Sequence, residues 1–218
     1  TRQDQKGYLN KIKDAGEGLL SLINDILDFS KIEAGQLDIY PDTFELSDLI
    51  DNLRTLFEMQ FLKKGLKFSI TLSKYVPPRI HNDRWRINQV LTNLLSNALK
   101  FTDQGSVKIH IEYLSDRDHL VFKVQDTGTG IEASYIKRIF DPFYQLEDHL
   151  KHHEEGTGLG LAICKKLVEL MAGEIRVESE IAVGTQFTVQ FPVNSDHVND
   201  RQDMVREQVA TTNRIESK

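Results

Sequence analysis

Three polar side chains, Asn93, Asn97 and Lys100, occur in one segment at intervals of four and three residues. In a helix these intervals place the three on nearly the same face, with leucine and alanine side chains on the opposite face. An amide oxygen is a hard, neutral ligand of the kind that Mg²⁺ accepts, and Mg²⁺ usually keeps substrate phosphates and waters as its other ligands. Two amides and one ammonium group therefore favour a site for phosphate and Mg²⁺. A solvated polar helix face is the alternative.

Two glycine-containing segments have residues that suit close contact with a ligand. Asp126 ends an apolar run and is followed by TGTG at 127–130. Its carboxylate can accept a hydrogen bond from an exocyclic amine, and the glycines let backbone approach a flat ring without a Cβ clash. The second segment, GTGLG at 156–160, precedes a predicted helix, where backbone N–H groups can bind an anion. A plain Asp-Gly turn is the alternative for the first segment. The second lacks the preceding strand of a dinucleotide-binding βαβ unit.

Helices and strands must position these residues. Apolar spacing predicts helices over 47–64, 84–101 and 159–171, and a short one over 132–139. Ser47 is the predicted cap of the first of these helices, and Gly65 its predicted end. Alternating apolar residues predict strands over 66–72, 107–113, 120–125, 174–179 and 185–191, the last after a turn at Gly184. A further strand, interrupted at Pro41, is expected between Leu37 and Leu46.

The beginning of the chain predicts one long helix. Apolar side chains from Tyr8 to Phe29 recur at intervals of four and three, the seam of a coiled coil over about three heptads. Leu20, Ile23 and Leu27 widen this stripe, which suits a four-helix bundle better than a two-stranded coil. A helix that packs on its own domain is the alternative.

Composition argues against several classes of protein. The 218 residues carry 27 Lys and Arg against 33 Asp and Glu, a net charge of −6, which disfavours a broad nucleic-acid interface. The single cysteine, Cys164, excludes an internal disulfide and is expected to be a small buried side chain. No apolar run approaches the ~20 residues that span a bilayer. Because the chain begins with Thr1 rather than Met, we expect a piece of a longer protein whose membrane anchor could lie upstream.

Taken in order, these segments resemble the catalytic, ATP-binding region of bacterial sensor histidine kinases. That region belongs to the ATPase superfamily that includes gyrase, Hsp90 and MutL. The resemblance covers about 37–193 and rests on an N box at 93–102, a G1 box at 126–130, an F box at 140–143, a G2 box at 156–160 and a G3 element at 184–185. Upstream, LLSLINDILDFSKIEAG at 19–35 is similar to the second helix of the dimerisation and phosphotransfer domain.

The resemblance implies an α+β fold of the Bergerat type. This is a two-layer α/β sandwich with a mixed sheet of about five strands and three helices on one face, from which the long first helix projects. The implied domains are 1–35 for the second dimerisation helix with its linker and 36–193 for the ATP-binding catalytic domain. Residues 194–218 would be a polar tail or linker without order.

The resemblance also implies a role for each matched residue. Asp126 would bind the adenine amine, with Thr185 nearby through water, and Asn97 would ligate Mg²⁺. The catalytic residues would be Asn93, Asn97 and Lys100. Residues 141–157 would form a mobile ATP lid, with Phe140 and Phe143 at its root. The full set expected to contact ATP or Mg²⁺ is Asn93, Asn97, Lys100, Asp126, Gly128, Gly130, Phe140, Thr157, Gly158, Leu159, Gly160 and Thr185.

The implied activity is transfer of the γ-phosphoryl group of ATP to a histidine, for relay to an aspartate of a response regulator. The implied setting is a homodimer whose catalytic region is cytoplasmic, in a protein that an inner-membrane anchor can hold, and no nucleic acid takes part. Two features depart from the family pattern. Position 129 is Thr where an aliphatic residue is usual, and among the seven histidines only His153, in the expected lid, precedes an acidic residue. We therefore expect the phosphate acceptor to lie on a helix absent from this chain.

Two other functions fit the sequence less well. An ATP hydrolase or ATP-driven clamp of the same superfamily would carry a glutamate base where this chain has Asn93, and an amide cannot take a proton from water. An interaction module that dimerises through the first helix without nucleotide would not need the phosphate-binding glycines and amides. Both are disfavoured.

Overall fold

The computed structural model describes residues 2–145 and 157–193, with the backbone alone at 2–15, 17 and 21. Four helices and seven strands occur in these ranges: α1 (Arg2–Glu33), β1 (Asp42–Glu45), α2 (Leu46–Lys63), β2 (Lys67–Leu72), β3 (Arg79–Asn82), α3 (Arg84–Phe101), β4 (Ser106–Leu114), β5 (His119–Asp126), α4 (Gly160–Leu170), β6 (Glu174–Glu180) and β7 (Gly184–Pro192).

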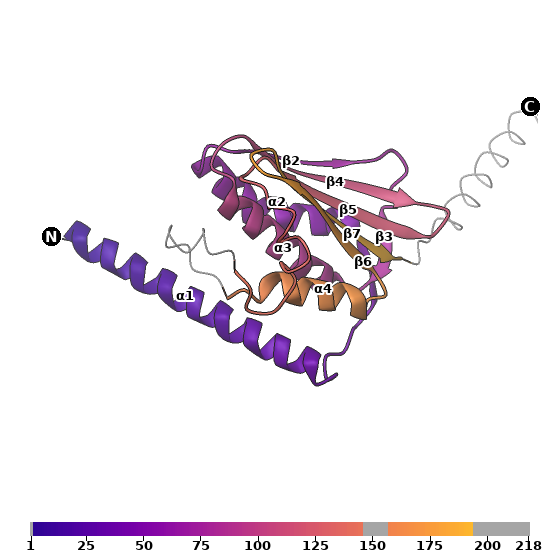
Figure 1. Ribbon diagram of the computed structural model, residues 1–218, viewed down its shortest axis with the longest axis horizontal. Helices are drawn as coiled ribbons and strands as arrows, with labels where there is room; N and C mark the ends of the chain where they lie inside the picture. The colour runs from indigo at the N-terminus through magenta and orange to yellow at the C-terminus, as the bar shows by residue number, and fades with distance from the viewer. Residues whose placement is uncertain (1, 146–156, 194–218) are drawn as a thin grey trace, which may run out of the picture.

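Five strands form a mixed sheet in the order β2-β4-β5-β7-β6. β2 and β4 are parallel, and the other neighbours are antiparallel. Helices α2, α3 and α4 cover one face of this sheet (Figure 1). Along β4 the buried side chains are Val107, Ile109 and Ile111, whereas Lys108 between them is exposed, as period two requires. The predicted fold class is confirmed.

Helix α3 runs through the centre of the helical layer, and its two sides differ. Ile87, Leu91 and Leu94 are among its buried residues, whereas the amide of Asn93 lies at the edge of this apolar face. The N-terminus of α3 is capped by a side chain, because the carboxylate of Asp83 accepts a hydrogen bond from Arg86 N at 3.1 Å. The core thus fixes the rotation of α3, and that rotation sets the direction of its polar residues.

Helix α1 lies on the far side of the helical layer from the sheet. Its C-terminal part runs beside α4, and its N-terminal part extends beyond the domain (Figure 1). The apolar seam from Leu19 to Leu27 is solvent-exposed, whereas Phe29 and Ile32 pack against the core of the domain. The helix therefore projects as expected only over its first part, and its last turns follow the alternative of packing on the domain.

Three local predictions were wrong. Residues 132–139 form successive turns rather than a helix, with bonds such as Tyr135 N to Glu132 O at 2.9 Å. The expected strand between Leu37 and Leu46 is confined to β1, which pairs with β3, a strand that was not predicted. Ser47 is not the cap of α2. The helix begins at Leu46, Glu45 occupies the cap position without a side-chain cap hydrogen bond, and Leu46 N donates to Pro78 O at 2.7 Å.

The expected lid falls mostly at 146–156, and the expected tail falls at 194–218. Both lie outside the described residues. None of the helices within the described ranges is long and apolar enough to cross a membrane.

Candidate nucleotide-binding site

The residues that were predicted to bind adenine meet at the end of β5. Asp126 is 8% exposed, and its Oδ1 accepts hydrogen bonds from Gly128 N at 2.8 Å and Thr185 N at 3.3 Å. Thr185 reaches this position because β7 pairs with β5. Burial raises the pKa of the Asp126 carboxyl, and the two backbone hydrogen bonds lower it by a smaller amount. The result is a desolvated acceptor that two backbone groups hold in place.

The loop after Asp126 is wedged between α3 and the β6–β7 turn. A Cβ at Gly128 would collide with the carbonyl oxygen of Phe101, and one at Gly130 with the carbonyl oxygen of Glu180. Thr129 N donates to Phe101 O at 3.2 Å, while the Thr129 side chain is exposed. The two glycines therefore allow close backbone packing, and the unusual Thr129 has room in solvent.

Asn93 of α3 faces the beginning of α4. Its Nδ2 donates to Gly160 O at 3.5 Å, and a Cβ at Gly160 would lie 3.6 Å from Asn93 Oδ1. The Thr157 hydroxyl oxygen accepts from Leu159 N at 2.9 Å, which forms a tight turn into α4. The Leu159 side chain is buried in the core, so only its backbone faces the turn.

The turn before α4 requires glycine at Gly158. Its φ of +69° is in the left-handed region, and a Cβ there would lie 2.8 Å from the carbonyl carbon of Phe143. Phe143 N donates to Gly158 O at 3.0 Å. The turn is thus fixed to the F-box segment, and it leaves the N-terminus of α4 as a place where an anion can bind.

Helix α3 connects the two groups of residues. Phe101 contacts the loop after Asp126, and Asn97 and Asn93 lie one and two turns back, so the two ends are separated by about 12 Å along the helix axis. Asn97 and Lys100 are half-buried, and Lys100 Nζ lies 5.1 Å from the centre of the Phe101 ring. The arrangement suits an elongated ligand with a flat base at one end and an anion at the other.

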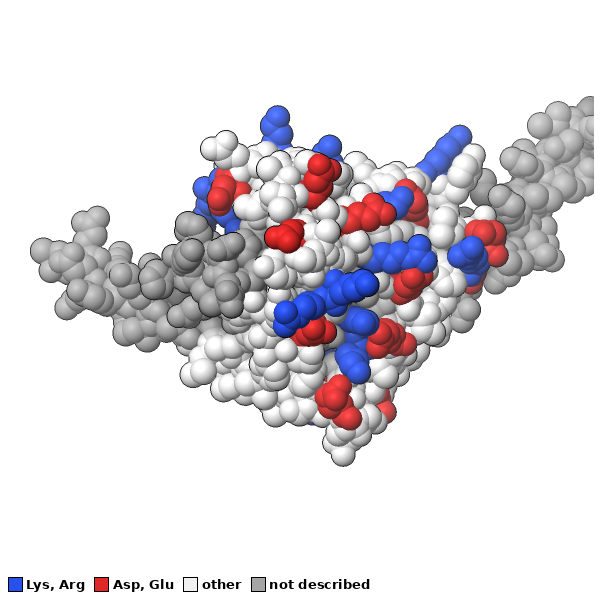
Figure 2. Space-filling view, in the orientation of Figure 1, with Lys and Arg blue, Asp and Glu red and all other residues white. Residues whose placement is uncertain are grey.

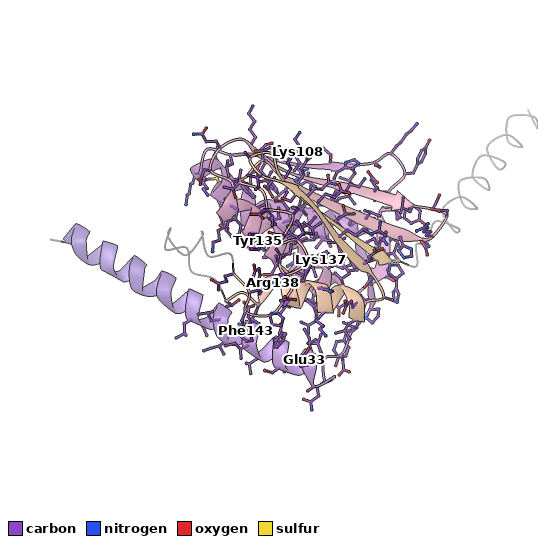
Figure 3. All side chains as sticks on the ribbon, viewed as in Figure 1. Glu33, Lys108, Tyr135, Lys137, Arg138 and Phe143 are labelled. Atoms are coloured by element: carbon purple, nitrogen blue, oxygen red, sulfur yellow. The ribbon has the colours of Figure 1, made fainter. Side chains whose placement is uncertain are left out.

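The two F-box phenylalanines lie at the side of the site. Phe140 packs edge to face on Phe187 of β7 at 6.4 Å between ring centres, and Lys165 Nζ lies 5.8 Å from the Phe140 ring centre. Phe143 is largely exposed and packs edge to face on Phe29, beside the C-terminal part of α1 (Figure 3). Phe140 therefore anchors this segment to the sheet, which suits the root of a lid better than direct contact with a ligand.

Sequence reasoning missed two polar residues at the site. Ser179 Oγ accepts from Ile131 N at 2.8 Å, donates to Gly184 O at 3.0 Å, and lies 2.8 Å from Thr185 Oγ1. Asp25 of α1 accepts from the Thr157 hydroxyl at 3.4 Å. The alternation of β6 could have shown that Ser179 is partly buried, but no local signal connects Asp25 with Thr157, 132 residues away.

Cys164 lies beneath the site and is completely buried. Its Sγ is 3.7 Å from Val90 O, and burial raises the pKa of the thiol to about 12. The thiol is therefore neutral at physiological pH, which agrees with the expected role as a small buried side chain.

The face of the molecule seen in Figure 2 carries basic and acidic side chains side by side. Lys166 pairs with Glu33 at 3.3 Å, and Arg138 pairs with Asp141 at 3.8 Å. On this face, outside its grey region, the charges of both signs are therefore interspersed.

Comparison with known proteins gives the family that the sequence motifs resemble. Residues 82–195 match the family described as histidine kinase-, DNA gyrase B-, and HSP90-like ATPase, and residues 1–35 match the His Kinase A (phospho-acceptor) domain. Sensor histidine kinase RcsC of Escherichia coli (strain K12) is 43% identical over 175 residues, which are 80% of this chain and 18% of that protein. The chain therefore spans less than a fifth of the length of this relative.

Solved structures share the fold. Full-length ShkA in complex with AMPPNP has a TM-score of 0.76 and 30% identity, over 88% of this chain and 39% of that one. Histidine kinase ThkA in complex with the response regulator protein TrrA has a TM-score of 0.64 and 27% identity, over 85% of this chain and 50% of that one. With its mixed sheet, its paired Asp126 and Thr185 and a family match over more than half of its length, the chain belongs to the histidine kinase-, DNA gyrase B-, and HSP90-like ATPases.

Proposed function

We propose that this chain is the ATP-binding catalytic part of a sensor histidine kinase. It binds Mg·ATP and transfers the γ-phosphoryl group to a histidine, for relay to an aspartate of a response regulator. One observation carries the proposal. α3 connects a desolvated carboxylate, held by Gly128 and Thr185, with a glycine turn at the N-terminus of α4.

Each end of the site has a distinct task. The two backbone bonds to Asp126 use Oδ1, so Oδ2 would accept the adenine amine. At the other end, the amides of Asn93 and Asn97 and the ammonium group of Lys100 would hold the phosphates in line for transfer. Phosphoryl transfer depends mainly on positioning and on neutralising charge, so side chains that bind phosphate and metal account for most of the catalysis.

The residues present fit Mg²⁺. Within the described ranges no group of three or more His, Cys, Asp or Glu side chains could hold a metal. Mg²⁺ needs few protein ligands when substrate phosphates and waters supply the others, and the amide oxygen of half-buried Asn97 would be its protein ligand. When bound, Mg²⁺ would neutralise charge on the phosphates. The domain boundaries at 35–36 and 193–194 stay part of this proposal.

The acceptor histidine would come from another segment. Residues 1–35, which match the phospho-acceptor domain, contain no histidine, and the first histidine of the chain is His81. The exposed apolar side chains of α1, Leu19 and Leu22 among them, support dimerisation through a helical bundle. The likeness to ThkA, whose solved complex contains a response regulator, supports a receiver domain as the next partner.

The test combines binding with transfer. Calorimetry should detect ATP binding that Mg²⁺ strengthens. A separately supplied dimerisation domain that carries the histidine should acquire phosphate slowly, because the two parts are not tethered. Release of inorganic phosphate from ATP at the same rate with and without that domain would favour the hydrolase instead, although Asn93 cannot act as its base. Failure of ATP to bind would refute the proposal.

A further inference from the structure

One face of α1 is attached to the catalytic domain by polar and apolar contacts. Asp28 accepts from Gln89 Nε2 at 2.7 Å and lies 3.6 Å from Arg86 Nη1, both on α3. One turn further, Ile32 is only 8% exposed. The attached residues recur at intervals of three and four, so they lie on one side of the helix. They are Asp25, Asp28, Phe29, Ile32 and Glu33.

Asp25 is the member of this face that reaches the glycine turn. Its Oδ2 accepts from the Thr157 hydroxyl at 3.4 Å, and the same hydroxyl oxygen holds Leu159 N. Asp25 is half-buried. Burial raises the pKa of its carboxyl, the bond from Thr157 lowers it, and the charge of Asp28 raises it again. A desolvated acidic side chain therefore contacts the turn that leads into α4.

The terminal phosphates of a nucleotide would need the same place. Thr157 is adjacent to Gly158, and the N–H groups at the beginning of α4 point toward any anion bound there. Two negative groups within a few ångströms of each other repel, most strongly where water is partly excluded. The repulsion would rise with the number of phosphates and would be small for a ligand that has none.

We propose that Asp25 makes the docked position of α1 an autoinhibitory contact: its carboxylate opposes the terminal phosphates, so docking of α1 and binding of a nucleoside triphosphate weaken each other. The inference rests on the proposed function, because it places phosphates at the turn before α4. Linkage requires the effect to be reciprocal, so a bound triphosphate loosens α1 by the factor by which docked α1 weakens the triphosphate.

Calorimetry with a ligand series tests this coupling. Adenosine, AMP, ADP and AMPPNP are titrated with Mg²⁺ into the parent chain and into Asp25→Asn. The asparagine keeps an oxygen that can accept from Thr157 and loses the charge. We expect tighter binding of AMPPNP by about fivefold or more, the lower end of typical coupling between sites. The gain should be smaller for ADP and AMP and absent for adenosine. Asp51→Asn, the same change at an exposed position on α2, should shift none of the four.

A second variant separates the charge from the packing. Phe29→Ala removes the contact with Phe143 and does not change the Asp25 side chain itself. It should tighten AMPPNP binding in the parent chain, because a looser α1 withdraws the carboxylate, but not in the Asp25→Asn background. Hydrogen exchange over 25–33 should quicken when AMPPNP binds the parent, and quicken less in Asp25→Asn.

The results distinguish two kinds of failure. An equal gain for all four ligands, or no gain for AMPPNP, would overturn the autoinhibitory contact while leaving the nucleotide site intact. If no ligand of the series binds to either protein, the proposed function itself fails, and this inference fails with it.

Discussion

Replacing Asp126 by asparagine should weaken nucleotide binding without lowering the stability of the fold. Oδ1 of Asp126 accepts both backbone bonds, from Gly128 N and Thr185 N. The amide oxygen of asparagine can accept the same two bonds, so the loop should keep its shape. The amide NH₂ group then occupies the position of Oδ2 and presents a donor to the adenine amine, which is also a donor.

The expected loss of affinity follows from that mismatch. A hydrogen bond to a charged group contributes roughly 1.5–3 kcal/mol, so ATP should bind about 10- to 150-fold more weakly to Asp126→Asn. The unfolding free energy of the free protein should not fall. Burial raises the pKa of Asp126 in the folded state. A carboxyl with a raised folded pKa contributes stability below its unfolded pKa, and the contribution is lost as the pH rises through the folded pKa. At pH 7 the buried carboxylate of the parent is charged, which lowers the stability of the folded state. The neutral asparagine avoids this loss.

Two measurements check this prediction. Calorimetry gives the affinity for ATP, and urea unfolding of the nucleotide-free protein gives the stability. Asp116→Asn is the matched control, because its side chain is 72% exposed in the β4–β5 turn, and it should alter neither. Acidification should also weaken ATP binding to the parent as Asp126 takes up a proton, and should have less effect on the variant. Parent-like affinity of Asp126→Asn for ATP would refute the assignment of Asp126 to adenine.

Three further predictions concern the phosphate end of the site. Asn97→Ala should remove the Mg²⁺-dependent part of ATP affinity in calorimetry and abolish transfer to a supplied dimerisation domain, and an unchanged Mg²⁺ effect would exclude Asn97 as a ligand. Gly158→Ala should lower the unfolding free energy in urea by about 1–2 kcal/mol, because an L-residue is strained at a φ of +69°, and should weaken ATP; parent-like stability would contradict the tight turn. When the chain is incubated alone with labelled ATP, it should gain no acid-labile phosphate. Labelled phosphate on His153 would contradict this prediction.

α3 and the three inner strands of the sheet, which the sequence predicted correctly, bury many apolar side chains at a regular interval. α3 has six buried residues on one face, and its predicted limits, 84–101, are the limits observed. β3 has four residues, and only Ile80 and Asn82 are buried. Four residues are too few for their alternation of buried and exposed side chains to predict a strand. β3 forms because β1 pairs with it. In the segment 132–139 only Ile139 is buried, and one anchoring side chain does not hold a helix.

The candidate site shows the same division between local and tertiary information. The helix face with Asn93 and Asn97 follows from spacing alone. The contact of Thr185 with Asp126 spans 59 residues and was expected only through resemblance to a family. The contact of Asp25 with Thr157 joins a helix to a turn that sequence reasoning placed in different domains. No residue near Asp25 or near Thr157 in the sequence indicates this contact, so only the packing of α1 could show it.

The exposed apolar seam of α1 and its docked residues give the helix two uses. Leu19, Leu22 and Ile26 continue the apolar seam and are exposed, whereas the next seam position, Phe29, packs on Phe143. Asp25, next to Ile26, contacts the glycine turn from an adjoining position on the helix surface. Phe29 belongs to both the seam and the docked face, but Leu19, Leu22 and Ile26 stay exposed in the docked position. A bundle built on these three side chains would therefore not have to displace the docked face. A nucleotide that loosens Asp25 would therefore move the catalytic domain relative to the bundle while the bundle stays assembled. We expect the oligomeric state, measured by sedimentation, to be the same with and without AMPPNP, and a nucleotide-dependent change in it would show that the two surfaces are not independent.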